Sequence, residues 1–152
     1  MRDHHGRQAV RDHAPVGQQL VGEFGQRPTV DRQRLVRVSD DVLRQVGRTI
    51  ASVMKRASDV VARAGQGGFL VLGVAMEADA ALRFAEQIVS RIRSLSIHHP
   101  RSVTGKFLTV SAGVVTAQPP RGASHATMLE ATQVAVDEAK SGGGNRAIRG
   151  EI

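Results

Sequence analysis

A glycine-rich stretch between two short apolar runs is the feature of this sequence that most constrains its fold. Residues 60–62 (Val-Val-Ala) form the first apolar run, and residues 69–72 (Phe-Leu-Val-Leu) form the second. Residues 65–68 (Gly-Gln-Gly-Gly) lie between them. Because glycine takes a positive φ without steric cost, tight turns use it readily. The stretch therefore predicts a β-hairpin whose turn is at residues 65–68.

A charged pair, Arg56 and Asp59, stands just before the first predicted strand. A guanidinium donates paired hydrogen bonds to a phosphate or a purine edge, and a carboxylate accepts from N–H donors. The pair therefore indicates a site for a ligand that offers both acceptors and donors, such as a phosphorylated purine. The alternative is a solvated turn in which Arg56 and Asp59 pair with each other, which contributes little to stability.

The spacing of these features resembles the GGDEF domain of diguanylate cyclases. In that family an Arg-x-x-Asp motif lies five residues before a Gly-Gly-(Asp/Glu)-Glu-Phe turn, and here the turn reads Gly-Gln-Gly-Gly-Phe (residues 65–69). Three other segments are similar to family segments and occur in the family's order. Residues 39–46, before the motif, resemble a Gly-Asp-x-Val-Leu helix start; after the turn, residues 107–115 resemble a Val-Thr-Val-Ser-x-Gly-Val strand and residues 139–146 an Ala-Lys-x-x-Gly-Arg-Asn ending. The resemblance covers about residues 6–148. It implies an α/β (α+β) fold of the nucleotidyl-cyclase-like palm type, with a central, mainly antiparallel sheet surrounded by helices.

The remaining patterns agree with one domain spanning residues 1–152. A chain of this length, with 41% hydrophobic residues, can bury a sizeable core. Three helices are predicted from apolar residues at helical spacing. The inner face of the first comprises Val42, Val46, Ile50 and Val53. The second, over about residues 78–95, has Ala81, Leu82, Ala85, Ile88, Val89, Ile92 and Leu95 on its inner face. The third has Met128, Leu129, Thr132, Ala135, Val136 and Ala139. Leu20, Val21 and Phe24 predict a strand before the first helix.

The resemblance also implies an active site that has lost its acidic residues. In the family, Mg²⁺ is coordinated by an Asp at a strand end and by an acid of the turn, where this chain has Glu23 and Gly67, and Gly68 replaces the next acid. Mg²⁺ requires hard oxygen ligands, and losing one electrostatic stabiliser typically costs a factor of hundreds in rate. The degenerate active-site positions are Glu23, Asp31, Asp40, Gly65, Gln66, Gly67, Gly68 and Lys140. We therefore expect no catalytic residue, no metal site, no cofactor and no turnover, with residual GTP binding left open.

In the family, the Arg-x-x-Asp motif is an inhibitory site that binds the product, cyclic di-GMP. The resemblance assigns Arg56 and Asp59 to this site together with a position of the long helix, where the family has Arg and this chain has Gln87. Arg83 and Arg91 lie one helical turn away on either side, and Arg91 is included in the predicted site. Two hypotheses follow: a cyclic di-GMP receptor in signal transduction, or a nucleotide-free pseudoenzyme that serves as a dimerisation or protein-interaction module.

The charge of the chain does not identify which partners it binds. The net charge is +7, and only three of the 21 basic residues are lysine. Arginine bias suits phosphate binding, but it also follows from a GC-rich genome. With four Phe and no Tyr or Trp, the sequence has no stacking motif for nucleic acid. No apolar run could span a membrane and no cysteine is present, so a cytoplasmic setting is expected, with cyclic di-GMP and a protein or second copy as partners.

Overall fold

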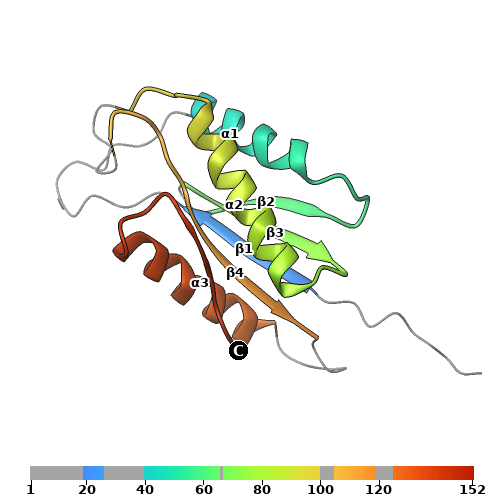
Figure 1. Ribbon diagram of the computed structural model, residues 1–152. Coiled ribbons are helices and arrows are strands. Elements are labelled where there is room, and N and C mark those ends of the chain that lie inside the picture. Colours follow the sequence, from blue (N-terminus) through green and yellow to red (C-terminus); the bar gives the residue numbers. More distant parts are fainter. Residues whose placement is uncertain (1–18, 26–39, 66, 100–104, 119–124) are drawn as a thin grey trace, which may run out of the picture.

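The computed structural model describes residues 19–25, 40–65, 67–99, 105–118 and 125–152. In these ranges the chain forms both helices and strands (Figure 1). The elements are β1 (Gln19–Gly25), α1 (Asp40–Val53), β2 (Val60–Ala64), β3 (Gly68–Val74), α2 (Ala78–Ser94), β4 (Ser111–Ala117), α3 (Ala126–Ser141) and β5 (Ala147–Arg149). No helix in the described ranges is long and apolar enough to cross a membrane.

The described strands form one sheet in the order β2-β3-β1-β4-β5. All neighbouring strands are antiparallel except β4 and β5, which are parallel. One row of paired residues crosses the whole sheet. It consists of Arg63, Phe69, Phe24, Ala112 and Ala147. The expected central, mainly antiparallel sheet is confirmed.

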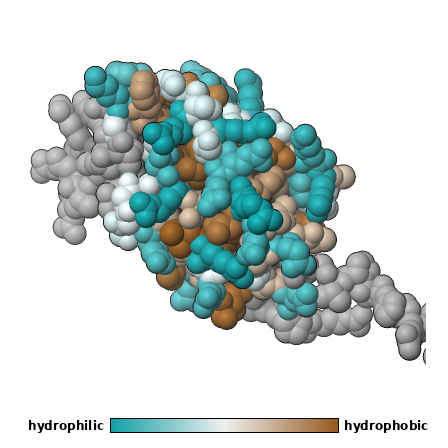
Figure 2. Space-filling model, in the orientation of Figure 1, coloured by the Kyte–Doolittle hydropathy of each residue, from teal (hydrophilic) through white to brown (hydrophobic). Residues whose placement is uncertain are grey.

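Helices cover both faces of the sheet (Figure 1). Side chains alternate across a strand, so neighbouring residues of β4 face different layers. Ala112 and Val114 belong to the core under α1 and α2, whereas Val115 packs with Met128 of α3. In the orientation of Figure 1, the visible surface is largely hydrophilic, with smaller apolar patches among the hydrophilic atoms (Figure 2). The burial of apolar side chains on both faces of the sheet is what holds the layers together.

The predicted inner faces of the helices are largely confirmed. Leu43, Val46, Ile50 and Val53 are the buried residues of α1, with Leu43 in place of the predicted Val42, which is only partly buried. In α3, Leu129 was expected inside but is 46% exposed. The inward positions of α3 are Met128, Thr132, Ala135, Val136 and Ala139, and Leu129 lies beside this stripe, where helix rotation against the sheet leaves it in solvent.

The predicted hairpin is present, with a shorter loop than expected. β2 and β3 pair up to Ala64 and Gly68, so only residues 65–67 connect them, and Gly68 belongs to the strand. Gly65 has a φ of 58°, a conformation that costs other L-residues energy. Phe69 follows and is buried under α1, where a Cβ on Gly47 would lie 3.0 Å from its ring. The glycine in α1 therefore lets the helix approach the hairpin closely.

Two other boundaries differ from those predicted. The strand predicted over residues 107–115 begins only at Ser111, because the residues before it pair with the segment after α2: His98 bridges Phe107, and the N–H of Leu108 donates to the carbonyl of Ile97. The short strand β5 was not predicted. Three residues are too few to show an alternating pattern, and their pairing with β4 depends on the tertiary fold.

Candidate functional site

The hairpin of β2 and β3 holds the predicted site residues in two groups, one at each end. Arg56 and Asp59 precede β2, whereas the glycine turn closes the other end of the hairpin. β2 contains five residues, so at about 3.4 Å per residue its ends lie roughly 14 Å apart. The sheet therefore separates the Arg-x-x-Asp motif from the degenerate active-site positions.

Arg56 and Asp59 form a turn that backbone and side-chain hydrogen bonds define together. The N–H of Asp59 donates to the carbonyl of Arg56, and the N–H of Arg56 donates back to Oδ2 of Asp59, each at 3.0 Å. The guanidinium of Arg56 reaches the end of β3, where Nη1 donates to the carbonyl of Val74 at 2.8 Å and lies 3.5 Å from that of Ala75. In this turn, Asp59 therefore accepts from the backbone of Arg56, while the guanidinium of Arg56 bonds to β3.

One oxygen of the Asp59 carboxylate has no hydrogen-bond partner among the residues that the structure describes. Oδ1 is buried, whereas Oδ2 accepts from the backbone of Arg56. A buried acceptor without a partner costs about 1–3 kcal/mol. A ligand that offers an N–H donor at this point would remove that cost, so the turn presents an acceptor next to a cationic group.

Gln87 and Arg91 lie on the exposed side of α2. In the described residues, neither forms a hydrogen bond or ion pair with Arg56 or Asp59. Because α2 begins at Ala78, soon after Val74, the rise of 1.5 Å per residue places Arg83 about 8 Å and Arg91 about 20 Å along the helix from its start. Arg83 is therefore the arginine of α2 that lies nearer the Arg56 end.

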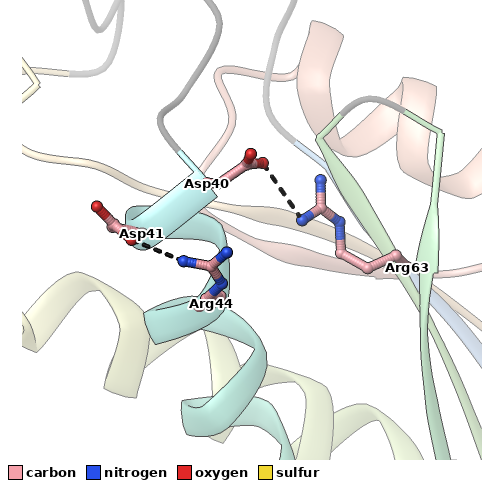
Figure 3. Close-up of polar contacts among 4 residues, drawn as sticks. All are labelled: Asp40, Asp41, Arg44 and Arg63. Atoms are coloured by element: carbon pink, nitrogen blue, oxygen red, sulfur yellow. Dashed lines mark hydrogen bonds and ion pairs between the residues drawn. The ribbon is translucent and has the colours of Figure 1, made fainter.

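At the opposite end, the fold brings several of the degenerate positions to one edge. Within the sheet, Glu23 pairs with Leu70 of β3 and Gly113 of β4, so its backbone lies two residues from the hairpin end of β3. Asp40 begins α1, and its Oδ1 lies 3.9 Å from Nη1 of Arg63 in β2 (Figure 3). The guanidinium of Arg63 also lies over the ring of Phe69, 5.9 Å from its centroid.

The sequence analysis did not single out Arg63. Its place two residues before the turn was visible, but its reach to Asp40 depends on how α1 packs against the hairpin. Both side chains remain largely in solvent, with 44% exposed for Arg63 and 77% for Asp40. The contact is therefore a surface ion pair that leaves Asp40 accessible to solvent.

The other positions carry little chemistry in this arrangement. A Cβ on Gly65 or Gly67 would meet no atom within 4 Å, so neither glycine is required by close packing. Lys140, with 16% of its side chain exposed, lies 4.0 Å from Asp137. Asp31 and Gln66 fall outside the described residues. Within the described part of the chain, no group of three or more His, Cys, Asp or Glu could hold a metal ion.

Residues 36–146 match the family of diguanylate cyclase GGDEF domains. Among solved structures, the active GGEEF domain of a diguanylate cyclase from Vibrio cholerae is similar, with a TM-score of 0.67 and 19% identity over 90% of this chain and 84% of that chain. The GGDEF domain of YfiN (TpbB) from Pseudomonas aeruginosa gives a TM-score of 0.64 and 26% identity over 88% of this chain and 77% of that chain.

A third structure was solved with a ligand. The GGDEF domain of DgcB from Caulobacter crescentus, in complex with c-di-GMP, gives a TM-score of 0.61 and 20% identity over 88% of this chain and 78% of that chain. No curated protein matches the chain. The family match and these structures agree with the expected α/β fold.

Proposed function

This chain belongs to the family of diguanylate cyclase GGDEF domains, and on that premise we propose that it is an inactive member that binds cyclic di-GMP through Arg56 and Asp59. The observation that carries this proposal is the buried Oδ1 of Asp59, which has no partner in the described part of the chain and lies beside the exposed Arg56. DgcB, which shares the fold, was solved with this ligand bound.

The chemistry of the turn suits that ligand. A guanine edge offers N–H donors that a carboxylate accepts, and a phosphate accepts from a guanidinium. Arg56 has five N–H donors, and its bonds to the backbone near Val74 occupy Nη1. The remaining donors stay available, and the bond to Val74 holds the group in one orientation. Binding therefore requires little further ordering of this side chain.

The absence of turnover follows from the residues at the other end of the hairpin. Cyclase chemistry needs carboxylates that hold Mg²⁺ against the phosphates. Gly67 and Gly68 supply none, and Gly144 replaces the arginine that the family uses on phosphate. Glu23 is the one acid left at the family's metal positions. Because charge stabilisation is usually the largest contribution to such a rate, this loss suffices to abolish catalysis.

Calorimetric titration of cyclic di-GMP tests the receptor. The wild-type chain is expected to bind in the micromolar range or tighter, and Arg56→Ala to bind at least tenfold more weakly. Arg56→Lys keeps the charge but loses the two-pronged donor geometry, so it is expected to weaken binding as well. Arg44→Ala is the matched control, because Arg44 is exposed and its ion-pair partner in the described ranges is the neighbouring Asp41 (Figure 3).

The contribution of α2 is tested by the same titration. Arg83→Ala is expected to weaken binding more than Arg91→Ala if the arginine nearer Arg56 completes the site. GTP with Mg²⁺ serves as the parallel ligand. If GTP binds and cyclic di-GMP does not, the nucleotide site is assigned to the glycine-turn end of the hairpin instead. Equal binding of cyclic di-GMP by wild type and Arg56→Ala would overturn the assignment to the Arg56–Asp59 turn.

A specific observation favours the second candidate, a protein-interaction module. Leu129 and Val134 on α3 are 46% and 63% exposed, so this helix presents two large apolar side chains to solvent. This role would be established instead by two results together. Neither cyclic di-GMP nor GTP would bind in the titrations, and sedimentation would show a concentration-dependent dimer that Val134→Lys disrupts.

A further inference from the structure

A pocket of about 290 Å³ lies between α2 and the turn that leads into β5. It shares no residue with the Arg56 turn or with the hairpin end described above. Its lining consists of Glu86, Val89, Ser90 and Arg93 from α2, and Asn145, Arg146 and Ala147 from the segment after α3. Two elements far apart in the sequence thus build its walls.

Two arginines face this pocket from its two walls. Arg93 lies in the last turn of α2, and Arg146 follows α3. Neither forms an ion pair with an acidic side chain in the described ranges. The guanidinium of Arg146 lies against the end of α3, where a Cβ on Gly142 would be 3.3 Å from Nη1. Two arginines that line one pocket, neither of them neutralised by a described carboxylate, offer the donors that a phosphate accepts from.

The pocket also presents acceptors. Oδ1 of Asn145 is buried, and no described residue forms a hydrogen bond with it. The backbone of this residue is left-handed, with a φ of 53°, a conformation that asparagine tolerates better than most residues. Glu86 adds a carboxylate and Ser90 a hydroxyl to the same lining. A ligand that satisfies them needs O–H or N–H donors close to its anionic group.

We infer that this pocket binds a phosphate ester that carries hydroxyl groups, of the size of a sugar phosphate or the sugar–phosphate part of a mononucleotide. Arg93 and Arg146 hold the phosphate, and Asn145 and Glu86 accept hydrogen bonds from the hydroxyls. A volume of 290 Å³ is at the small end of ligand pockets, so a cyclic dinucleotide exceeds it. The inference is independent of cyclic di-GMP binding at Arg56.

The test is an NMR titration of the ¹⁵N-labelled wild-type chain with inorganic phosphate and, separately, with ribose 5-phosphate. Both probes are expected to shift the amide signals of Asn145, Arg146 and Ala147 in a saturable way. Ribose 5-phosphate is expected to bind at least threefold more tightly than phosphate. Arg93→Gln and Arg146→Gln are each expected to weaken it at least tenfold.

Two further variants serve as a second test of the site and as a control for net charge. Asn145→Asp tolerates the left-handed backbone but places a negative charge beside the phosphate, so it is expected to weaken binding. Arg48→Gln removes the same charge from the exposed face of α1 and is expected to leave binding unchanged. A loss with Arg48→Gln equal to that with Arg146→Gln would reduce the effect to net charge and overturn the site.

The absence of saturable shifts at residues 145–147 would also overturn the inference. Equal affinity for phosphate and ribose 5-phosphate would overturn the inferred recognition of hydroxyl groups, and the pocket would then bind only the anion. None of these variants touches Arg56 or Asp59, so a failure here is distinguishable from a failure of the cyclic di-GMP titration.

Discussion

The guanidinium of Arg56 donates a hydrogen bond of 2.8 Å to the carbonyl oxygen of Val74, 18 residues further along the chain. Arg56 precedes β2 and Val74 ends β3, so this bond closes the open end of the hairpin. The next residue, Ala75, has a φ of 56°, which brings a second carbonyl to 3.5 Å from the same nitrogen. One side chain thus serves the hairpin and, in our proposal, the ligand.

Arg56→Ala is expected to lower the free energy of unfolding by about 1 kcal/mol, because an exposed hydrogen bond from a charged donor is lost. In a domain of this size that corresponds to a fall of about 2–4 °C in melting temperature. Thermal unfolding followed by circular dichroism measures it. A loss of more than about 3 kcal/mol would show that the residue is mainly structural, and the binding titration would then depend on Arg56→Lys.

Asp59→Asn separates the ligand role of this residue from its role in the turn. The amide oxygen of Asn can still accept from the N–H of Arg56, so the stability is expected to change by less than about 1 kcal/mol. Affinity for cyclic di-GMP is expected to fall at least tenfold, because the charge that guanine donors favour is removed. Unchanged affinity in calorimetry would contradict the assignment of Oδ1 to the ligand.

The wild-type chain is expected to form no cyclic di-GMP from GTP and Mg²⁺, as measured by chromatography of the products. Restoring the two acids as Gly67→Asp with Gly68→Glu is expected to increase the affinity for Mn²⁺, a paramagnetic substitute for Mg²⁺. The turn has room for a side chain at position 67, since a Cβ there meets no atom within 4 Å. Product formed by the wild-type chain would refute the proposed inactivity.

Gly113→Ala is expected to destabilise the chain by roughly 2–4 kcal/mol, because α3 lies directly on this strand residue. A Cβ there would come within 2.6 Å of the backbone N of Val136 and still closer to the carbonyl of Thr132, and backbone cannot move aside cheaply. Gly67→Ala is the control, with an expected change within about 0.5 kcal/mol. Chemical denaturation compares them, and equal effects would contradict the close packing.

The contact between Arg63 and Asp40 is expected to contribute little to folding. At 3.9 Å and with both side chains largely exposed, it is a surface ion pair. A double-mutant cycle with Arg63→Ala and Asp40→Ala is expected to give a coupling energy below about 0.5 kcal/mol, falling further in high salt. A coupling above about 1 kcal/mol would instead show that this pair fastens α1 to the hairpin.

The sequence predicted the position of strongly periodic helices well. It did not predict the short strand β5 or the rotation of α1. α2 was expected over about residues 78–95 and spans Ala78–Ser94, because its apolar stripe repeats over several turns. In α1 the same kind of pattern favoured Val42, yet Leu43 is the buried residue, since the rotation of a helix is set by what it packs against. β5 offers only three residues and forms because β4 is beside it.

The sequence by itself determined the family resemblance, the hairpin and a turn that contains no acidic residue, because these depend on which residues occur and at what spacing. The tertiary structure decided the rest: that Arg56 bonds to Val74, that Arg63 reaches Asp40, and that Asn145 and Arg146 face α2. Each of these contacts joins segments far apart in the chain. Their geometry is set by how helices and sheet bury their apolar faces, which no local pattern specifies.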